Sequence, residues 1–124
     1  MNQVKKFEDL QVWKDAMDLC TVIYKATNSS SFSKEFVLKE QIRKSVVSIP
    51  SNIAEGFERD SHKQFIYFLI IAKGSCGELR TQLKIAQLLE YIAQEQYNIL
   101  NNNCLLVSKQ LSGFINYLKH YKPS

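Results

Sequence analysis

The chain has 124 residues, of which 45% are hydrophobic and 23% charged, and its formal net charge is +4. This length suits one domain over residues 1–124, and the composition is that of an ordinary globular protein. The longest apolar run, residues 65–72, is far shorter than the roughly 20 residues that cross a bilayer. Because the first residues also lack the apolar core of a secretory signal, we expect a cytoplasmic protein without a membrane partner.

The first predicted helix covers residues 10–26. Apolar residues recur there at spacings of three and four, and Glu8 and Asp9 stand before it, where carboxylates favour the positive end of the helix dipole. We expect Phe7 to fold back against the first turn. The predicted core stripe consists of Leu10, Trp13, Met17, Cys20 and Tyr24, widened by Ala16, Leu19 and Ile23.

The second predicted helix begins near Ser33, its N-cap, and continues through Pro50 to a turn that starts at Gly56. Its apolar residues keep one phase on both sides of the proline, which predicts a single kinked helix. An interior proline costs roughly 3 kcal/mol, so packing must offset that loss. The predicted core stripe consists of Leu38, Ile42, Val46, Ile49, Ile53 and Phe57.

A polar stripe runs beside this apolar face, and serine and asparagine are indifferent helix formers. Two interpretations remain open. The stripe is either a solvated face or a close-packed, hydrogen-bonded seam against a neighbouring helix or subunit, with its last three members paired inside. The stripe consists of Gln41, Ser45, Ser48, Asn52, Glu55 and Arg59, and Pro50 and Gly56 belong to the same seam.

The third predicted helix follows the capping-box pattern Ser61–Gln64 and extends to about Glu90. Its core stripe consists of Phe65, Leu69, Ala72, Cys76, Leu79, Leu83 and Ala86. Gly74 and Gly77 interrupt this helix, and we expect them to allow close contact with another helix near Pro50.

The start of the third helix is apolar on every side, which one four-helix bundle would not bury. Exposed apolar patches of this kind usually mark interfaces, so we expect a homo-oligomer. The candidate interface consists of Phe65, Ile66, Tyr67, Ile70 and Ile71.

The fourth predicted helix starts near Gln94, where Ala93 is a poor N-cap. Its core stripe consists of Leu100, Cys104, Val107, Leu111, Phe114 and Leu118. Four amphipathic helices with short connections predict an all-α, antiparallel up-down-up-down four-helix bundle with a Pro-kinked second helix.

Motifs for chemistry are absent from the sequence. A di-metal bundle site needs two Glu-x-x-His pairs, and neither His62 nor His120 has a glutamate three residues before it. Cys20, Cys76 and Cys104 lack the spacing of a disulfide framework or zinc site, and we expect reduced, buried thiols. We therefore expect no catalytic residues, no metal and no cofactor.

Basic residues suggest one candidate binding surface. Lys73, Arg80 and Lys84 share one helical face, and residues 96–124 contain no carboxylate. This surface is either a solvated face or a contact for a polyanion. The candidate nucleic-acid-binding residues are Lys73, Arg80, Lys84, Lys109, Lys119 and Lys122.

Three segments carry a family resemblance: FEDLQVWKDA at 7–16, QIRKSVVSIPSNIAEGFER at 41–59 and FLIIAKGSCGEL at 68–79. They resemble the bacterial four-helix-bundle proteins encoded by intervening sequences in 23S ribosomal RNA genes. That resemblance implies an up-down bundle that assembles as a ring-like homopentamer, with no established enzymatic activity. The family is also similar to the accessory variability proteins of diversity-generating retroelements, basic pentamers that bind a reverse transcriptase and nucleic acid.

Two functional hypotheses follow from these observations. The first is a non-enzymatic, homo-oligomeric bundle that binds RNA or a nucleoprotein partner such as one containing a reverse transcriptase. The alternative is a protein–protein interaction scaffold that binds no nucleic acid. A ligand or metal site in the bundle core is disfavoured because the ligand motifs are missing.

Overall fold

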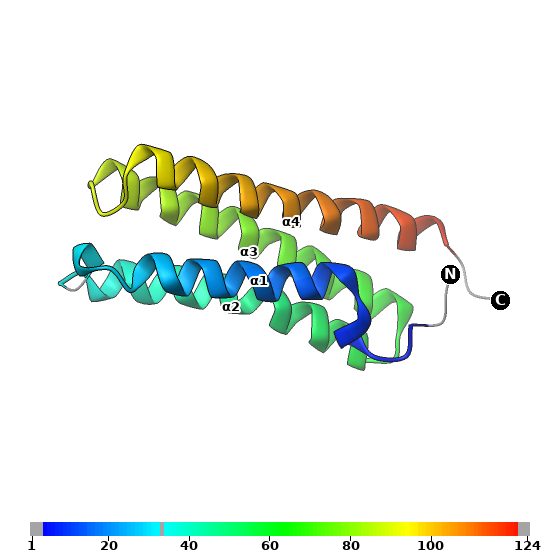
Figure 1. Ribbon diagram of the computed structural model, residues 1–124. Coiled ribbons are helices and arrows are strands. Elements are labelled where there is room, and N and C mark those ends of the chain that lie inside the picture. The colour runs from blue at the N-terminus through cyan, green and yellow to red at the C-terminus, as the bar shows by residue number, and fades with distance from the viewer. Residues whose placement is uncertain (1–3, 33, 122–124) are drawn as a thin grey trace.

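The computed structural model describes residues 4–32 and 34–121 and contains four long helices (Figure 1). Short 3-10 turns stand at Phe7–Asp9 (η1) and Ser30–Phe32 (η2). No strand is found in the described ranges. The long helices are α1 (Gln11–Thr27), α2 (Phe36–Glu58), α3 (His62–Leu88) and α4 (Gln94–His120).

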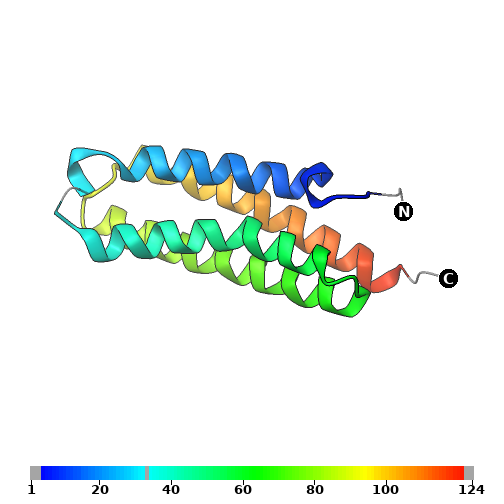
Figure 2. The same ribbon diagram turned by 90° about the horizontal axis from the view of Figure 1, so that it is seen from below.

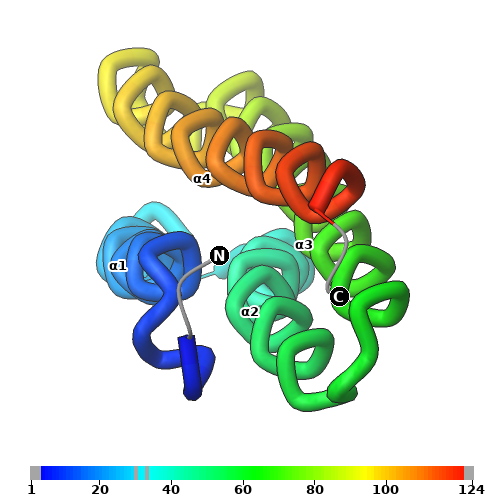
Figure 3. The backbone as a smooth tube through the Cα atoms, turned by 90° about the vertical axis from the view of Figure 1, so that its right-hand side faces the viewer, coloured from blue at the N-terminus to red at the C-terminus, as the bar shows by residue number. Residues whose placement is uncertain are grey.

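Successive helices run in opposite directions, and α1 begins at the end of the bundle where α4 ends (Figure 1). Viewed along the axis, the helices follow one another around the bundle in chain order (Figure 3). Each helix packs on the next, and α1 closes the bundle against α4. Helix α2 runs alongside α3 over most of its length (Figure 2). The predicted up-down-up-down fold class is confirmed.

The core forms where the apolar stripes of the four helices meet. In α2, Ile42, Val46, Ile49 and Ile53 are fully buried, as predicted. The predicted stripes of α3 and α4 are also buried, except that Phe65 and Phe114 are half-buried and stack edge-on, with ring centroids 5.5 Å apart. Periodicity therefore located the core face of these three helices correctly.

The predicted core face of α1 was wrong in part. Met17 and Tyr24 are 42% and 40% exposed, whereas Ala16, Leu19 and Ile23 from the widened side of the stripe are buried. Both sides of α1 carry apolar residues, so periodicity alone could not show which side faces the bundle centre. Phe7 does fold back as predicted, and its ring lies 5.4 Å from that of Trp13.

The predicted boundaries of α2 need two corrections. Ser33 lies outside the described residues, and the helix starts three residues later, with the Glu35 carboxylate accepting the Leu38 amide at 3.1 Å as the N-cap. Gly56 does not end the helix, which continues to Glu58. The chain reverses at Asp60, whose φ of 53° lies in the left-handed region that aspartate tolerates better than most residues.

The predicted continuity of α2 through Pro50 is confirmed. Proline has no amide proton, so the carbonyl of Val46, four residues earlier, loses its helical donor. The thiol of Cys20 on α1 donates to that carbonyl, with Sγ 3.3 Å from the oxygen. Burial raises the pKa of the Cys20 thiol to about 11, so the proton needed for this bond is present at neutral pH. A neighbouring helix thus satisfies the group that the proline leaves unpaired.

Helices α2 and α3 are in close contact at Gly56. A Cβ atom added there would lie 2.6 Å from Cβ of Phe68, and such a separation is sterically impossible without movement of α3. Within this chain, Gly74 and Gly77 do not make the expected close helix contact near Pro50, because an added Cβ at either position meets nothing within 4 Å. The sequence pattern located glycines in α3, but the close approach uses a glycine of α2.

The starts of α3 and α4 differ in how they are capped. Ser61 Oγ accepts the Gln64 amide at 3.2 Å, whereas Ala93 supplies no side-chain cap to α4. His62 Nε2 lies 2.7 Å from the carbonyl oxygen of Leu118, in the last turn of α4. With Nε2 protonated, this histidine donates to a carbonyl in the last turn of α4, and it ties the end of α4 to the start of α3.

Removal of the thiol tests the role of Cys20. Cys20→Ala should lower the free energy of unfolding by about 1–2 kcal/mol, because packing is lost and the Val46 carbonyl is left unpaired. In a Pro50→Ala background the new amide can donate to that carbonyl, so the same change should cost about 0.5–1 kcal/mol less. Urea denaturation of the four proteins at one concentration measures this cycle. Equal costs in the two backgrounds would contradict the assignment.

Substitution of Gly56 tests the close contact between α2 and α3. Gly56→Ala should destabilise the protein by roughly 1–3 kcal/mol, because the added methyl group pushes against Phe68. Gly113→Ala in α4 is the matched control, since a Cβ atom there meets nothing within 4 Å. It should stabilise the protein by about 0.5–1 kcal/mol through helix propensity. Urea denaturation should therefore give shifts of opposite sign, and a neutral Gly56→Ala would refute the contact.

Candidate functional site

The middle of the polar stripe on α2 faces α3. Ser45 is buried, and Ser48 and Asn52 are half-buried. Ser48 Oγ lies 2.6 Å from Ser75 Oγ on α3 and 2.8 Å from the Ser45 carbonyl oxygen, and Asn52 donates to the Ser48 carbonyl at 2.7 Å. Pro50 is buried on the same helix. These short side chains form a hydrogen-bonded seam within the chain.

The ends of the polar stripe face solvent. Gln41 is exposed, and Glu55 and Arg59 form an ion pair of 2.8 Å whose side chains are 50% and 49% exposed. Such a pair contributes little to stability. The Arg59 guanidinium also lies over the Phe68 ring, 4.9 Å from its centroid. The expected pairing of Asn52 with Glu55 and Arg59 inside the seam does not occur, because Asn52 turns back to its own helix.

Three of the four cations of α3 lie on the side of the helix that meets α4. Arg80 Nε donates to Asn101 Oδ1 of α4 at 3.0 Å. Lys84 Nζ lies 5.0 Å from the Tyr97 ring centroid and donates to Gln87 at 3.1 Å. Lys73 is exposed on the same helical face, two turns before Arg80. We call Lys73, Arg80 and Lys84 the basic line.

A shallow hollow of about 350 Å³ accompanies the basic line, lined by Gly77, Arg80, Thr81, Lys84, Ile85 and Tyr97. The α4 residues that contact the basic line, Tyr97 and Asn101, were missed by the sequence analysis. The sequence could have indicated these two residues only through their position, because they occupy the side of α4 that turns toward α3. Helix α3 has four cations and a single carboxylate, Glu78, so the local charge is positive.

The candidate cations of α4 do not all join the basic line. Lys119 stands 18 residues after Asn101, which is five full helical turns, so both occupy the same face of α4. Lys109 is exposed and lies about 80° further round the helix. Lys122 lies outside the described residues. The structure therefore brings Lys119 to the α3–α4 side and leaves Lys109 on the outer surface.

The apolar start of α3 has an inner and an outer face. Phe65 points into the bundle, where it contacts Phe57 and Phe114, and Ile66 and Ile71 are half-buried. Tyr67 and Ile70 are 55% and 47% exposed. The outward face continues beyond the predicted residues through Gly74, Gly77 and Thr81 to Ile85 and Leu88, which are also exposed. We call this surface, from Tyr67 to Leu88, the outer α3 face.

The thiols and histidines form no metal-binding cluster in the described part of the chain. No group of three or more His, Cys, Asp or Glu side chains could hold a metal ion there. Cys76 and Cys104 are free and buried, and burial raises their pKa values to about 11 and about 12. Both thiols are therefore protonated at neutral pH. None of the described helices is long and apolar enough to span a membrane.

Comparisons with known proteins agree with this architecture. The family model for the 23S rRNA-intervening sequence protein matches residues 8–113. A crystal structure of a Bacteroides thetaiotaomicron protein of unknown function, from the S23 ribosomal protein family, is 33% identical, with a TM-score of 0.77. The match covers 84% of this chain and 97% of that one. No curated protein matches the chain significantly. The chain belongs to the family of 23S rRNA-intervening sequence proteins.

Proposed function

We propose that this protein is a non-enzymatic, cytoplasmic, homo-oligomeric bundle that binds RNA through the basic line. The observation that carries the proposal is the alignment of Lys73, Arg80 and Lys84 beside Tyr97, along the junction of α3 and α4. Membership of a family named for ribosomal RNA intervening sequences supports an RNA partner but does not identify it.

The geometry suits contact with phosphates. Arg80 is held by Asn101 through Nε, which leaves its terminal nitrogens on the outer side of the guanidinium for other acceptors. Lys84 lies over the Tyr97 ring, so its position is restrained before any ligand arrives. A line of cations along one helix follows a phosphate backbone without reading its sequence. The expected binding is therefore electrostatic and sensitive to salt.

Assembly is the second part of the proposal. The outer α3 face exposes Tyr67, Ile70, Ile85 and Leu88 within one helix, and its glycines leave room for close approach by another helix. A second copy of the chain is the occupant we propose, and the family resemblance favours a ring-like homopentamer. The cations of the basic line lie beside this face and share a hollow with its residues Gly77, Thr81 and Ile85, so subunit contact would repeat the RNA-binding surface around a ring, at the edge of each contact. Similarity to retroelement accessory proteins makes a reverse-transcriptase nucleoprotein a further candidate partner.

Charge reversal tests the basic line. A Lys73→Glu/Arg80→Glu/Lys84→Glu variant should bind a labelled 20-nucleotide RNA hairpin at least about tenfold more weakly at 100 mM salt. The slope of log affinity against log salt should also flatten by about 2–3, because up to three phosphate contacts are lost. Fluorescence anisotropy across a salt series measures both quantities.

The matched control carries the same change of net charge on another surface. Lys5, Lys6 and Lys14 are exposed, and their joint replacement by glutamate should weaken binding much less. Equal weakening in the control would show that only net charge matters. A wild-type protein that retains no RNA at low salt would refute RNA binding. Capture of a defined protein partner that survives nuclease treatment would then favour the scaffold hypothesis.

Disruption of the outer α3 face tests assembly. The wild-type protein should have a mass in solution that is a multiple of 14.4 kDa. A Tyr67→Glu/Ile70→Glu variant should shift toward the single-chain mass, because two carboxylates would be desolvated in the contact. A Met17→Glu/Leu106→Glu variant, altered at residues 42% and 60% exposed on other helices, should keep the wild-type mass. Light scattering after gel filtration gives these masses, and a monomeric wild type would contradict the proposal.

A further inference from the structure

A hollow beside α1 and α2 lies on the opposite side of the bundle from the basic line. It has a volume of about 810 Å³ and is lined by Tyr24 of α1 and by residues of the first half of α2, among them Phe36, Val37, Arg43, Lys44 and Val47. This volume falls within the range of small-molecule sites, roughly 300–1,000 Å³. Neither the basic line nor the outer α3 face includes any of these residues.

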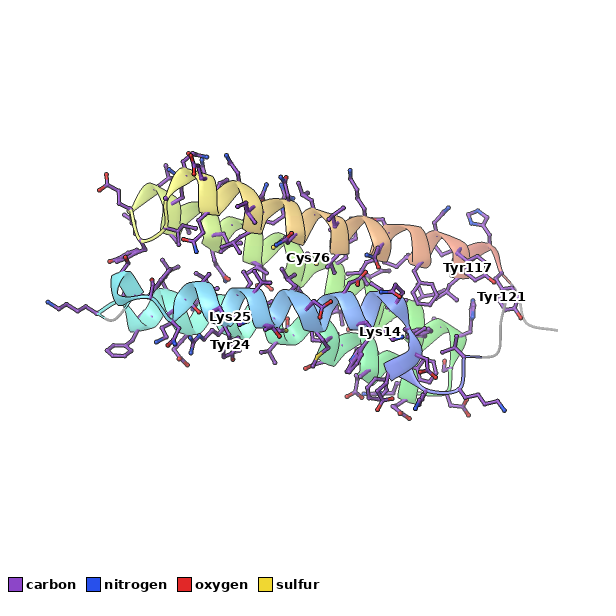
Figure 4. All side chains as sticks on the ribbon, viewed as in Figure 1. Lys14, Tyr24, Lys25, Cys76, Tyr117 and Tyr121 are labelled. Carbon is purple, nitrogen blue, oxygen red and sulfur yellow. The ribbon has the colours of Figure 1, made fainter. Side chains whose placement is uncertain are left out.

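Arg43 and Tyr24 form an ordered cationic platform in this hollow. The Arg43 guanidinium lies over the Tyr24 ring, 4.4 Å from its centroid. Arg43 Nε donates to Thr27 Oγ1 at 2.9 Å, and Nη2 donates to the Tyr24 carbonyl at 3.3 Å. Both partners belong to the last turn of α1, of which Figure 4 labels Tyr24 and Lys25. Three contacts thus hold a planar cation in one orientation at the surface.

Large apolar side chains around this platform are exposed to solvent and are not part of the bundle core. Phe36 and Val37, in the first turn of α2, are 65% and 73% exposed, and Val47 is 41% exposed. Exposed aromatic side chains beside cations are the arrangement that proteins use to stack unpaired bases while holding the adjacent phosphates.

The charge of the surrounding segment favours a polyanion over a neutral or basic partner. Residues 24–48 contain five cations, Lys25, Lys34, Lys39, Arg43 and Lys44, and only two carboxylates, Glu35 and Glu40. This segment therefore accounts for +3 of the net charge of +4. Glu40 is the single carboxylate in the lining of the hollow.

On the basis of the proposed RNA binding, we infer that this hollow binds single-stranded RNA, with unpaired bases stacking on Phe36 and on the Arg43–Tyr24 platform. Lys44 supplies a phosphate contact at the rim. Paired bases would not fit this role, because their faces are covered by neighbouring pairs within a duplex. The basic line reads only backbone charge, so the two surfaces should differ in their preference for unpaired RNA.

A stacking residue can be tested with substitutions that leave the fold intact. Phe36 is largely exposed at the first position of α2, so Phe36→Ala removes little packing and favours the helix. With a fluorescein-labelled 15-nucleotide oligouridine, Phe36→Ala should weaken binding at least about fivefold, as expected for the loss of one stacked base. Phe36→Tyr should bind within about twofold of wild type, and Phe36→Leu should resemble Phe36→Ala because it lacks an aromatic face.

The same variants with the 20-nucleotide hairpin, at equal salt, separate the two surfaces. Phe36→Ala should change hairpin affinity less than twofold if the hairpin binds through the basic line. Ile99→Ala is the matched control, because Ile99 is 61% exposed on α4, and it should change neither affinity. Solution mass, measured for every variant, should stay at the wild-type value.

Each contrary result has a distinct meaning. If wild type binds the hairpin but Phe36→Ala binds oligouridine normally, the stacking site is wrong and the proposed function stands. If Phe36→Leu retains full affinity, the surface acts through apolar area and the stacking assignment is wrong. If Phe36→Ala lowers the mass in solution, the hollow is a subunit contact instead. If wild type binds neither RNA, both the stacking site and the proposed function are refuted.

Discussion

The packing of the bundle depends on α2 remaining one continuous helix across Pro50. Pro50 removes the donor for the Val46 carbonyl, and an unpaired carbonyl among buried side chains costs about 1–3 kcal/mol. The Cys20 thiol of α1 supplies the replacement donor at 3.3 Å. The donor belongs to a different helix. The packing of α1 against α2 therefore helps α2 to remain helical at Pro50. The core residues Val46 and Ile53 on either side of the proline then stay in one phase and face the same core.

Helix α3 is in close contact with α2 on one side and exposes apolar side chains to solvent on another. Short residues line this contact, with Ser48 and Ser75 2.6 Å apart and no room for a Cβ atom at Gly56. The start of α3 is apolar on every side, so its bulky residues cannot all turn inward, and Tyr67 and Ile70 occupy the outer face. The cations of the basic line lie between that face and α4. One helix thus presents an apolar surface and a basic surface side by side, which is why subunit contact and RNA contact are compatible in the proposed function.

Membership of the family determines the fold of this chain but identifies no biochemical activity. The related crystal structure is itself of a protein of unknown function. What distinguishes the functional hypotheses is therefore the surface of this chain. The basic line offers charge with little aromatic area, whereas the hollow around Phe36 offers exposed aromatic rings within a segment of net charge +3. The two surfaces predict different responses to unpaired and paired RNA, and those responses separate the roles experimentally.

Periodicity and local chemistry in the sequence determined the helices, the core faces of α2, α3 and α4, the passage of α2 through Pro50, and the family. The helices, their core faces and the passage through Pro50 depend on residues within one helix, and the family depends on three separate segments of the sequence. The tertiary structure decided the rest, because it concerns which neighbour each face meets. Only packing could show that α1 buries Leu19 rather than Met17, and that Gly56 rather than Gly74 makes the close contact. The same holds for the placement of Tyr97 against Lys84 and of Tyr24 against Arg43, since these partners come from different helices and no spacing along the chain relates them.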